Sequence, residues 1–191
     1  MENSDPRYVR SREGLRRALV ELAHEEPSKI NVRAICERSG VERATFYRHF
    51  NELDDLIADT LADLAERGAA EWKAVSRGTG DQYEASESIL REYFHHIEDN
   101  WLLYRWALGP DGSAKTIHAV LQRTISSVEL ELQALIPAQD PLERELRGAY
   151  AGGGLLGICL LWLKSETPRM SPDKLAAWVT AMAPNLAPFR G

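Results

Sequence analysis

Apolar residues recur along most of this chain with the spacing of an amphipathic α-helix. In the first such segment Leu15, Ala18, Leu19 and Leu22 fall at i, i+3, i+4 and i+7, which places them on one helical face. No segment alternates apolar and polar residues for long enough to predict a β-strand. The pattern predicts an all-α protein of about nine helices, among them residues 8–25, 32–39, 43–50, 83–99, 113–135, 141–164 and 171–183. A further helix starts after Asn51 and carries an apolar stripe as far as Trp72, and a short aromatic-rich segment lies at 101–108.

The segment 31–50 has the pattern of two short helices joined by a tight turn. Asn31 is a good N-cap for the first helix, and Gly40 fits the turn because a residue without Cβ takes positive φ at little cost. Phe46 and Phe50 share one i, i+4 face of the second helix, so we expect them to pack inward and leave the opposite face free. This pattern predicts a helix-turn-helix, a motif whose second helix enters the major groove of DNA.

The segment 141–164 starts with charged residues and becomes apolar on every side, with three consecutive glycines at 152–154. A helix that is apolar on every face must be buried on every face. We therefore expect either the central helix of one domain or, as we favour, a helix shared between the core and a partner subunit. Glycine costs about 1 kcal/mol relative to Ala inside a helix, so the three glycines predict close backbone approach or a local break.

Charge is unevenly distributed along the chain. The net charge is −6, yet residues 1–50 carry ten Lys or Arg and eight Asp or Glu, whereas residues 51–191 carry thirteen and twenty-one. Five arginines lie between residues 7 and 17. A locally basic end on an acidic body fits a protein that meets nucleic acid with that end, although such a charge run is as often a solvated helix face.

Other functions have little support in the sequence. Cys36 and Cys159 lie in separate apolar helical patterns, which predicts buried thiols in a reduced, cytoplasmic protein without an export signal. The longest uncharged run, residues 148–163, has 16 residues and is shorter than the roughly 20 that span a bilayer. His95 and His96 lack a second cluster at metal-ligand spacing. We find no nucleophile–base motif, phosphate loop or cofactor fingerprint, so we expect neither an enzyme nor a cofactor.

The outer face of the predicted helix at 43–50 carries groups that recognise DNA. Arg43 and Arg48 can each donate two hydrogen bonds to a guanine edge, and Thr45 can hydrogen-bond to a base or offer its methyl group to thymine. Tyr47 and His49 can donate to phosphates. These side chains predict that this helix reads base pairs.

The run G-V-x-x-x-T-F-Y-x-H-F from Gly40 to Phe50 resembles the DNA-binding domain of the TetR family of transcriptional regulators, and the resemblance covers about residues 13–56. It implies a helix-turn-helix domain at 1–52 and a ligand-binding and dimerisation domain at 53–191. It further implies a homodimer on a near-palindromic operator, usually a repressor, whose two heads change spacing when an unknown small molecule binds. The DNA contacts that it implies are, for bases and adjacent phosphates, Arg33, Arg43, Ala44, Thr45 and Arg48, and, for phosphates, Tyr47 and His49.

Two positions depart from the family pattern. Glu42 stands where the family often has Ser, which removes a good N-cap; its carboxylate can accept from cytosine N4 or hold Arg43. Leu53 stands where a phosphate-binding Lys is common, and Asp54 and Asp55 follow it. The loss of that cation weakens the expected backbone contacts, unless the arginines of the first helix compensate.

The C-terminal part also resembles a TetR-type domain, through Y-F-x-x-I-x-x-N at 93–100 and G-L-L-G-x-x-x-x-W-L at 154–163. It is similar to the subgroup that includes a coactivator of dihydroxyacetone kinase genes, so a coactivator that acts through protein contacts is the alternative function. By this resemblance the last two helices form the dimer interface, with candidate contacts at Gly153, Leu156, Leu160 and Trp178. Several aromatic residues and one histidine either line a ligand cavity or fill the core, namely Trp72, His96, Trp101, Tyr104 and Trp106.

Overall fold

A computed structural model describes residues 5–75, 82–110, 112–135 and 140–182 of the chain. Within these ranges the fold is all-α, as predicted, and the predicted helices begin and end within about three residues of the observed ones. The described helices are α1 (Pro6–Glu25), η2 (Pro27–Lys29), α2 (Val32–Ser39), α3 (Arg43–His49), α4 (Leu53–Val75), α5 (Gln82–Asp99), α6 (Trp101–Leu108), α7 (Ala114–Leu135), α8 (Pro141–Trp162) and α9 (Pro172–Met182).

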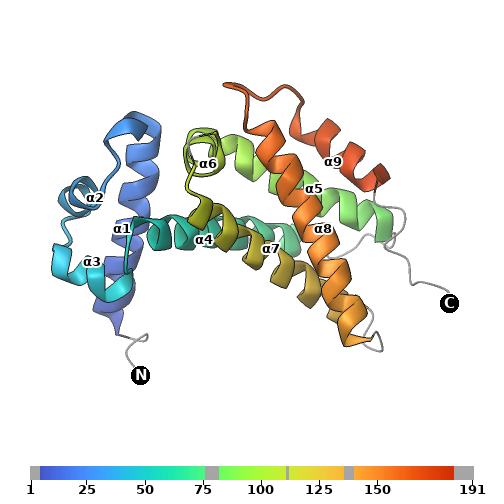
Figure 1. Cartoon of the computed structure of the whole chain (residues 1–191), viewed down its shortest axis with the longest axis horizontal. Coiled ribbons are helices and arrows are strands. Elements are labelled where there is room, and N and C mark those ends of the chain that lie inside the picture. Colours follow the sequence, from blue (N-terminus) through green and yellow to red (C-terminus); the bar gives the residue numbers. More distant parts are fainter. Residues whose placement is uncertain (1–4, 76–81, 111, 136–139, 183–191) are drawn as a thin grey trace.

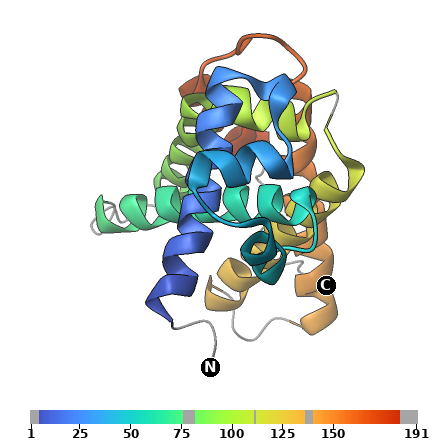
Figure 2. The same ribbon diagram turned by 90° about the vertical axis from the view of Figure 1, so that its left-hand side faces the viewer.

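The helices form two parts joined by α4 (Figure 1). We call α1–α3 the head and α5–α9 the body. In the body α5 packs along α9 and α7 packs along α8, while α6 contacts α1 of the head. Figure 2 looks onto the head, with the body behind it.

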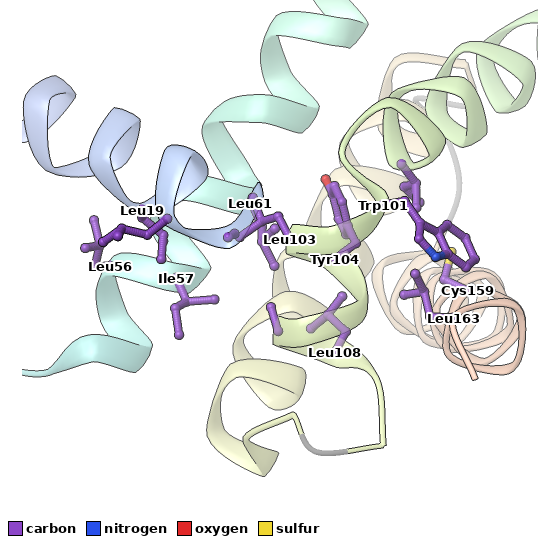
Figure 3. Close-up of a cluster of buried hydrophobic side chains, with 14 of the residues drawn as sticks. Leu19, Leu56, Ile57, Leu61, Trp101, Leu103, Tyr104, Leu108, Cys159 and Leu163 are labelled. Atoms are coloured by element: carbon purple, nitrogen blue, oxygen red, sulfur yellow. The ribbon is translucent and has the colours of Figure 1, made fainter. Parts of the chain in front are cut away.

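Buried apolar side chains run as one continuous cluster from the head into the body. Leu19 of α1 lies beside Leu56 of α4, Leu61 of α4 lies beside Leu103 of α6, and Tyr104 of α6 continues the cluster toward Leu163 just after α8 (Figure 3). The head is therefore packed against the body through α6 as well as joined to it by α4.

The inner face of α8 lies very close to α7. A Cβ added to Gly152 would stand 2.9 Å from Cα of Ile125, and one added to Gly148 would stand 2.5 Å from Cγ of Glu129. Because real Cβ atoms almost never approach so closely, these glycines allow the two helices to touch. The close approach predicted for the glycine run is confirmed at Gly152, and α8 continues through all three glycines without a break.

The outer face of α8 is uncovered by any described part of the chain. A Cβ added to Gly153, Gly154 or Gly157 would meet nothing within 4 Å. Large apolar side chains on the same side are exposed, with Tyr150 at 78% and Leu161 at 67%. Burial of this helix within one domain, the first of the two alternatives, is therefore not observed, and the favoured alternative, a helix shared with a partner subunit, stays a prediction. No described helix is both long enough and apolar enough to cross a membrane.

Candidate DNA-binding site

The helix-turn-helix forms through the local signals seen in the sequence. The side chain of Asn31 accepts a hydrogen bond from the Ala34 N–H at 3.0 Å and so caps α2. Gly40 ends α2 with φ of 68°, in the left-handed region that favours glycine. Phe46 is fully buried and Phe50 nearly so, as predicted. These two rings fix α3 to the head and turn its opposite face outward.

The outer face of α3 is polar and cationic. Arg43, Ala44, Tyr47 and Arg48 are exposed, and Thr45 is half-buried. Arg43 donates a hydrogen bond to the Tyr47 hydroxyl at 3.3 Å, and its guanidinium carbon lies 5.9 Å from the centre of the Tyr47 ring. The pair presents a cation and a hydroxyl together, as guanine edges and phosphates require.

Arg33 and Glu42 lie beside this face. Arg33 is exposed on α2, where its Nε donates to Glu37 at 2.7 Å. Glu42 occupies the N-cap position of α3 without a side-chain capping bond, as its departure from Ser predicts. Since Arg43 pairs with Tyr47, the structure gives no support to the alternative in which Glu42 holds Arg43.

His49 is placed differently from Tyr47. Its Nε2 lies 2.7 Å from the Ser11 hydroxyl, and its ring is tilted against the Tyr8 ring with centroids 4.1 Å apart. Ser11 also lies within 3.0 Å of the Arg7 and Tyr8 carbonyls, so its proton has an acceptor there and the ring donates Nε2–H to its oxygen. Nδ1 is buried with no hydrogen-bond partner among the described residues.

Burial lowers the pKa of His49, and the nearby Arg12 and Arg48 cations lower it further against a small opposing effect of Asp59. The ring is therefore a neutral brace between α1 and α3. Sequence reasoning missed its partners Tyr8 and Ser11, because no local pattern links residues 38 positions apart.

Ion pairs join α1 to α4. The Arg12 guanidinium binds the Asp59 carboxylate, and Arg16 donates to Asp59 at 2.7 Å and to Asp63 at 2.6 Å. Burial raises the pKa of Asp59, but the hydrogen bonds from Arg16 and Arg12 outweigh burial and leave the pKa lowered. Arg12 and Arg16 are therefore bound by carboxylates of α4. The predicted replacement of the missing phosphate-binding Lys is left to the other arginines of the first helix.

The candidate ligand residues lie in the core of the body. Trp101 is buried, donates from Nε1 to the Glu166 carbonyl at 2.9 Å, and packs edge-on against Trp162. Tyr104 is buried, its hydroxyl hydrogen-bonds with Nε2 of His96 at 3.0 Å, and burial raises its pKa. The half-buried Trp106 packs against the same cluster. Trp72 belongs to the part of α4 whose side chains lie outside the described residues.

The candidate dimer residues fall on different sides of their helices. Gly153 lies on the open side of α8, and Trp178 of α9 is 49% exposed. Leu156 is only 5% exposed, because it follows Gly152 at i+4 on the inner face. Leu160 is partly buried against the core. Leu156 is therefore covered within the chain, and its contact with a partner subunit stays a prediction.

The comparison with known proteins agrees with this geometry. Residues 15–60 match the family model described as bacterial regulatory proteins, tetR family. No curated protein sequence matches the chain significantly. Solved structures share the fold, a helix-turn-helix head followed by a helical body, along nearly the whole chain.

Three of these structures illustrate the likeness. The fatty acid degradation regulator FadR from Bacillus halodurans is 15% identical with a TM-score of 0.59, over 89% of this chain and 96% of that one. RolR in complex with resorcinol is 16% identical with a TM-score of 0.65, over 92% and 88%. The dihydroxyacetone kinase operon activator DhaS is 16% identical with a TM-score of 0.57, over 90% and 93%. This chain is therefore similar to tetR-family regulators at residues 15–60 and shares the fold of these solved structures along most of its length.

Proposed function

We propose that this protein is a homodimeric repressor that binds a near-palindromic operator and leaves it when a small molecule binds the body. The observation that carries the proposal is that one chain leaves two unlike faces uncovered, a cationic one on α3 and an apolar one on α8. We take residues 1–52 as the DNA-binding domain and 53–191 as the ligand-binding and dimerisation domain. The proposal places the protein in the cytoplasm, with the DNA that it regulates.

DNA recognition is assigned to the side chains that α2 and α3 expose. Arg43 and Arg48 read base edges from the major groove, with Ala44 and Thr45 beside them. Arg33 and Tyr47 contact phosphates. Nε2 of His49 hydrogen-bonds with Ser11, and Nδ1 is buried. We therefore propose that His49 affects phosphate binding indirectly, by holding α3 against Ser11 of α1.

Dimerisation is assigned to the outer face of α8 together with α9. The exposed side chains of this face are Leu142, Leu146, Tyr150, Leu161, Trp178 and Met182. The open glycines between them, at 153, 154 and 157, allow a partner helix to approach closely. A two-fold axis through this face pairs it with itself and holds two heads for two half-sites about 34–36 Å apart.

The effector site is assigned to the aromatic cluster around α6. This cluster borders α1 of the head and the connecting helix α4, so a ligand that separates its side chains also moves the head. One fold neighbour, RolR, is described with resorcinol, which makes a small aromatic effector reasonable. In this proposal Trp101, Tyr104, His96 and Trp106 bind the effector after rearranging from their packed positions, and Trp72 also binds it.

A coactivator that acts through protein contacts is the alternative, because DhaS is an operon activator with the same fold. Its support in the sequence is Leu53 and the acidic residues after it. The structure gives these residues other partners: Leu53 packs against the core, and Asp54 and Asp55 bind α7. The acidic start of α4 therefore fits a working head fixed to its body.

Selection of duplexes from a random DNA pool, followed by gel shift over a salt series, separates these functions. A repressor enriches a near-palindrome and binds it with a steep salt dependence, because arginines release counterions from phosphates. Release of that duplex by a small aromatic compound supports the effector site. A protein that enriches no sequence is the coactivator.

A further inference from the structure

The first turn of α7 holds the start of α4 through three carboxylates. The Thr116 hydroxyl, which is fully buried, donates to Asp54 at 2.8 Å. The Lys115 ammonium pairs with Glu52 and lies 3.3 Å from Asp55. We call this group of five residues the α7 clamp.

The α7 clamp lies immediately after the reading helix. Helix α3 ends at His49 and α4 begins at Leu53, so three residues separate them. Within this turn the Asn51 N–H donates to Asp55 at 3.0 Å, which ties the turn to a carboxylate that Lys115 also binds. Any displacement of the start of α4 from α7 is therefore passed to α3 across a short, hydrogen-bonded segment.

The same helix α7 also supports α8, whose outer face we assign to dimerisation. Its far half packs against the inner face of α8, at Ile125 and Glu129. Helix α7 thus connects α8 with the turn after α3, by contacts that are independent of α6. Resting on the proposed function, we propose that Lys115 and Thr116 are positioning residues contributed by the body, which set the orientation of each head and hence the half-site spacing that the dimer accepts.

The charges in the α7 clamp also bear on DNA binding. Glu52, Asp54 and Asp55 would repel phosphates beside the reading helix if they were uncompensated. Lys115 neutralises part of this charge, because its ammonium pairs with Glu52 and lies 3.3 Å from Asp55. The body therefore reduces the negative charge beside α3.

The test uses the duplex that wild-type protein selects and a second duplex with one base pair inserted between its half-sites. The variants are Thr116→Val, which removes the hydroxyl, Thr116→Ser, which keeps it, and Lys115→Gln. Arg123→Gln is the matched control, because Arg123 pairs with Glu66 between the same two helices but farther from α3. Dissociation constants for both duplexes and melting temperatures are measured for each.

We expect Thr116→Val to weaken binding to the selected duplex about tenfold and to bring the affinities for the two duplexes closer together, because Asp54 loses its buried donor. Thr116→Ser and Arg123→Gln should keep the wild-type ratio. If Thr116→Val leaves the ratio of the two dissociation constants at its wild-type value, whether or not both affinities fall, the proposal is overturned. If Thr116→Val does not fold, the exposed Lys115→Gln decides by the same ratio. If wild-type protein selects no duplex, the proposed function fails first, and the clamp's role in DNA spacing fails with it.

Discussion

Helices α3 and α8 each leave one face uncovered, and the two faces differ in chemistry. That of α3 is short and cationic, with Arg43, Tyr47 and Arg48 exposed. That of α8 is long and apolar, with Tyr150 and Leu161 exposed around open glycines. An apolar surface is stabilised by removal from water, whereas arginines gain most from phosphates and guanine edges. The difference is the basis of the proposal that one face binds a protein partner and the other binds DNA.

The two faces are also held differently. Helix α3 has seven residues and depends on two buried phenylalanines and on contacts from α1. Helix α8 has 22 residues and rests on α7 through glycines that allow close contact. Helix α3 therefore depends on its neighbours for its orientation, whereas α8 is held directly against α7.

The largest expected effect comes from making the α8 face resemble the α3 face in polarity. The double variant Tyr150→Glu with Leu161→Glu should be monomeric at micromolar concentration, because it would bury unpaired charges at the interface. Affinity for the selected duplex should fall by at least about a hundredfold, since the two heads then bind independently. Light scattering after size exclusion and gel shift measure the two effects. Leu130→Glu, at an exposed position on α7, is the control, and a double variant that stays dimeric would refute this interface.

How far the sequence predicts these faces depends on the range of the contacts involved. The cap at Asn31, the turn at Gly40 and the inward face of Phe46 were predictable, because each depends on residues within about one helical turn. The side of α8 that faces outward was not, because a helix apolar all round carries no periodicity to distinguish Leu156 from Leu161.

The contacts of the head with α1 and α7 were equally hidden. The bond between Thr116 and Asp54 joins residues 62 positions apart, and no local pattern encodes it. The same holds for His49, whose motif indicates a DNA-facing residue while its ring is packed against Tyr8. The exposed side chains of α3 could be predicted individually from the sequence. The contacts that hold α3 in place could be identified only from the structure.

Removing one cation from the α3 face tests its assignment to DNA. Arg48→Ala should lose about 1–3 kcal/mol of specific binding per half-site and relax base preference at one position. Tyr47→Phe should weaken binding to all sequences alike, because a phosphate contact carries no sequence information. Repeated selection with each variant measures both outcomes, with Arg169→Ala, at an exposed position of the body, as the control. An Arg48→Ala protein with unchanged affinity and preference would mean that α3 does not lie in the groove as proposed.

Alanine at two adjacent glycines of α8 compares the inner and outer sides directly. Gly152→Ala should destabilise the chain by about 1–2 kcal/mol, because its Cβ would press on the Ile125 backbone. Gly153→Ala meets open space, so in the monomeric double variant it should stabilise the helix by up to about 1 kcal/mol. Denaturant unfolding of both variants in that background gives the two values. Equal effects would show that α8 does not rest on α7 through Gly152.

The smallest expected effect concerns His49, the α3 residue that turns away from the outer face. Burial and the Arg12 and Arg48 cations lower the pKa of His49 in the folded chain below its unfolded value of about 6.5. The unfolded chain then binds the proton more readily, so the stability that depends on the neutral ring is complete above about pH 6.5 and is lost as the pH falls toward the folded pKa.

We expect the melting temperature of wild-type protein to fall more steeply between about pH 7.5 and 5.5 than that of His49→Gln, whose amide can still donate to Ser11 without titrating. The difference between the two curves removes the contribution of the other histidines. A solvent-exposed His49 ring would give two parallel curves of melting temperature against pH. A His49 ring bound to a carboxylate would make the wild-type curve fall less steeply than the His49→Gln curve. The sign of this difference therefore distinguishes a neutral His49 that holds α3 against Ser11 from an exposed His49 that is available to bind a DNA phosphate.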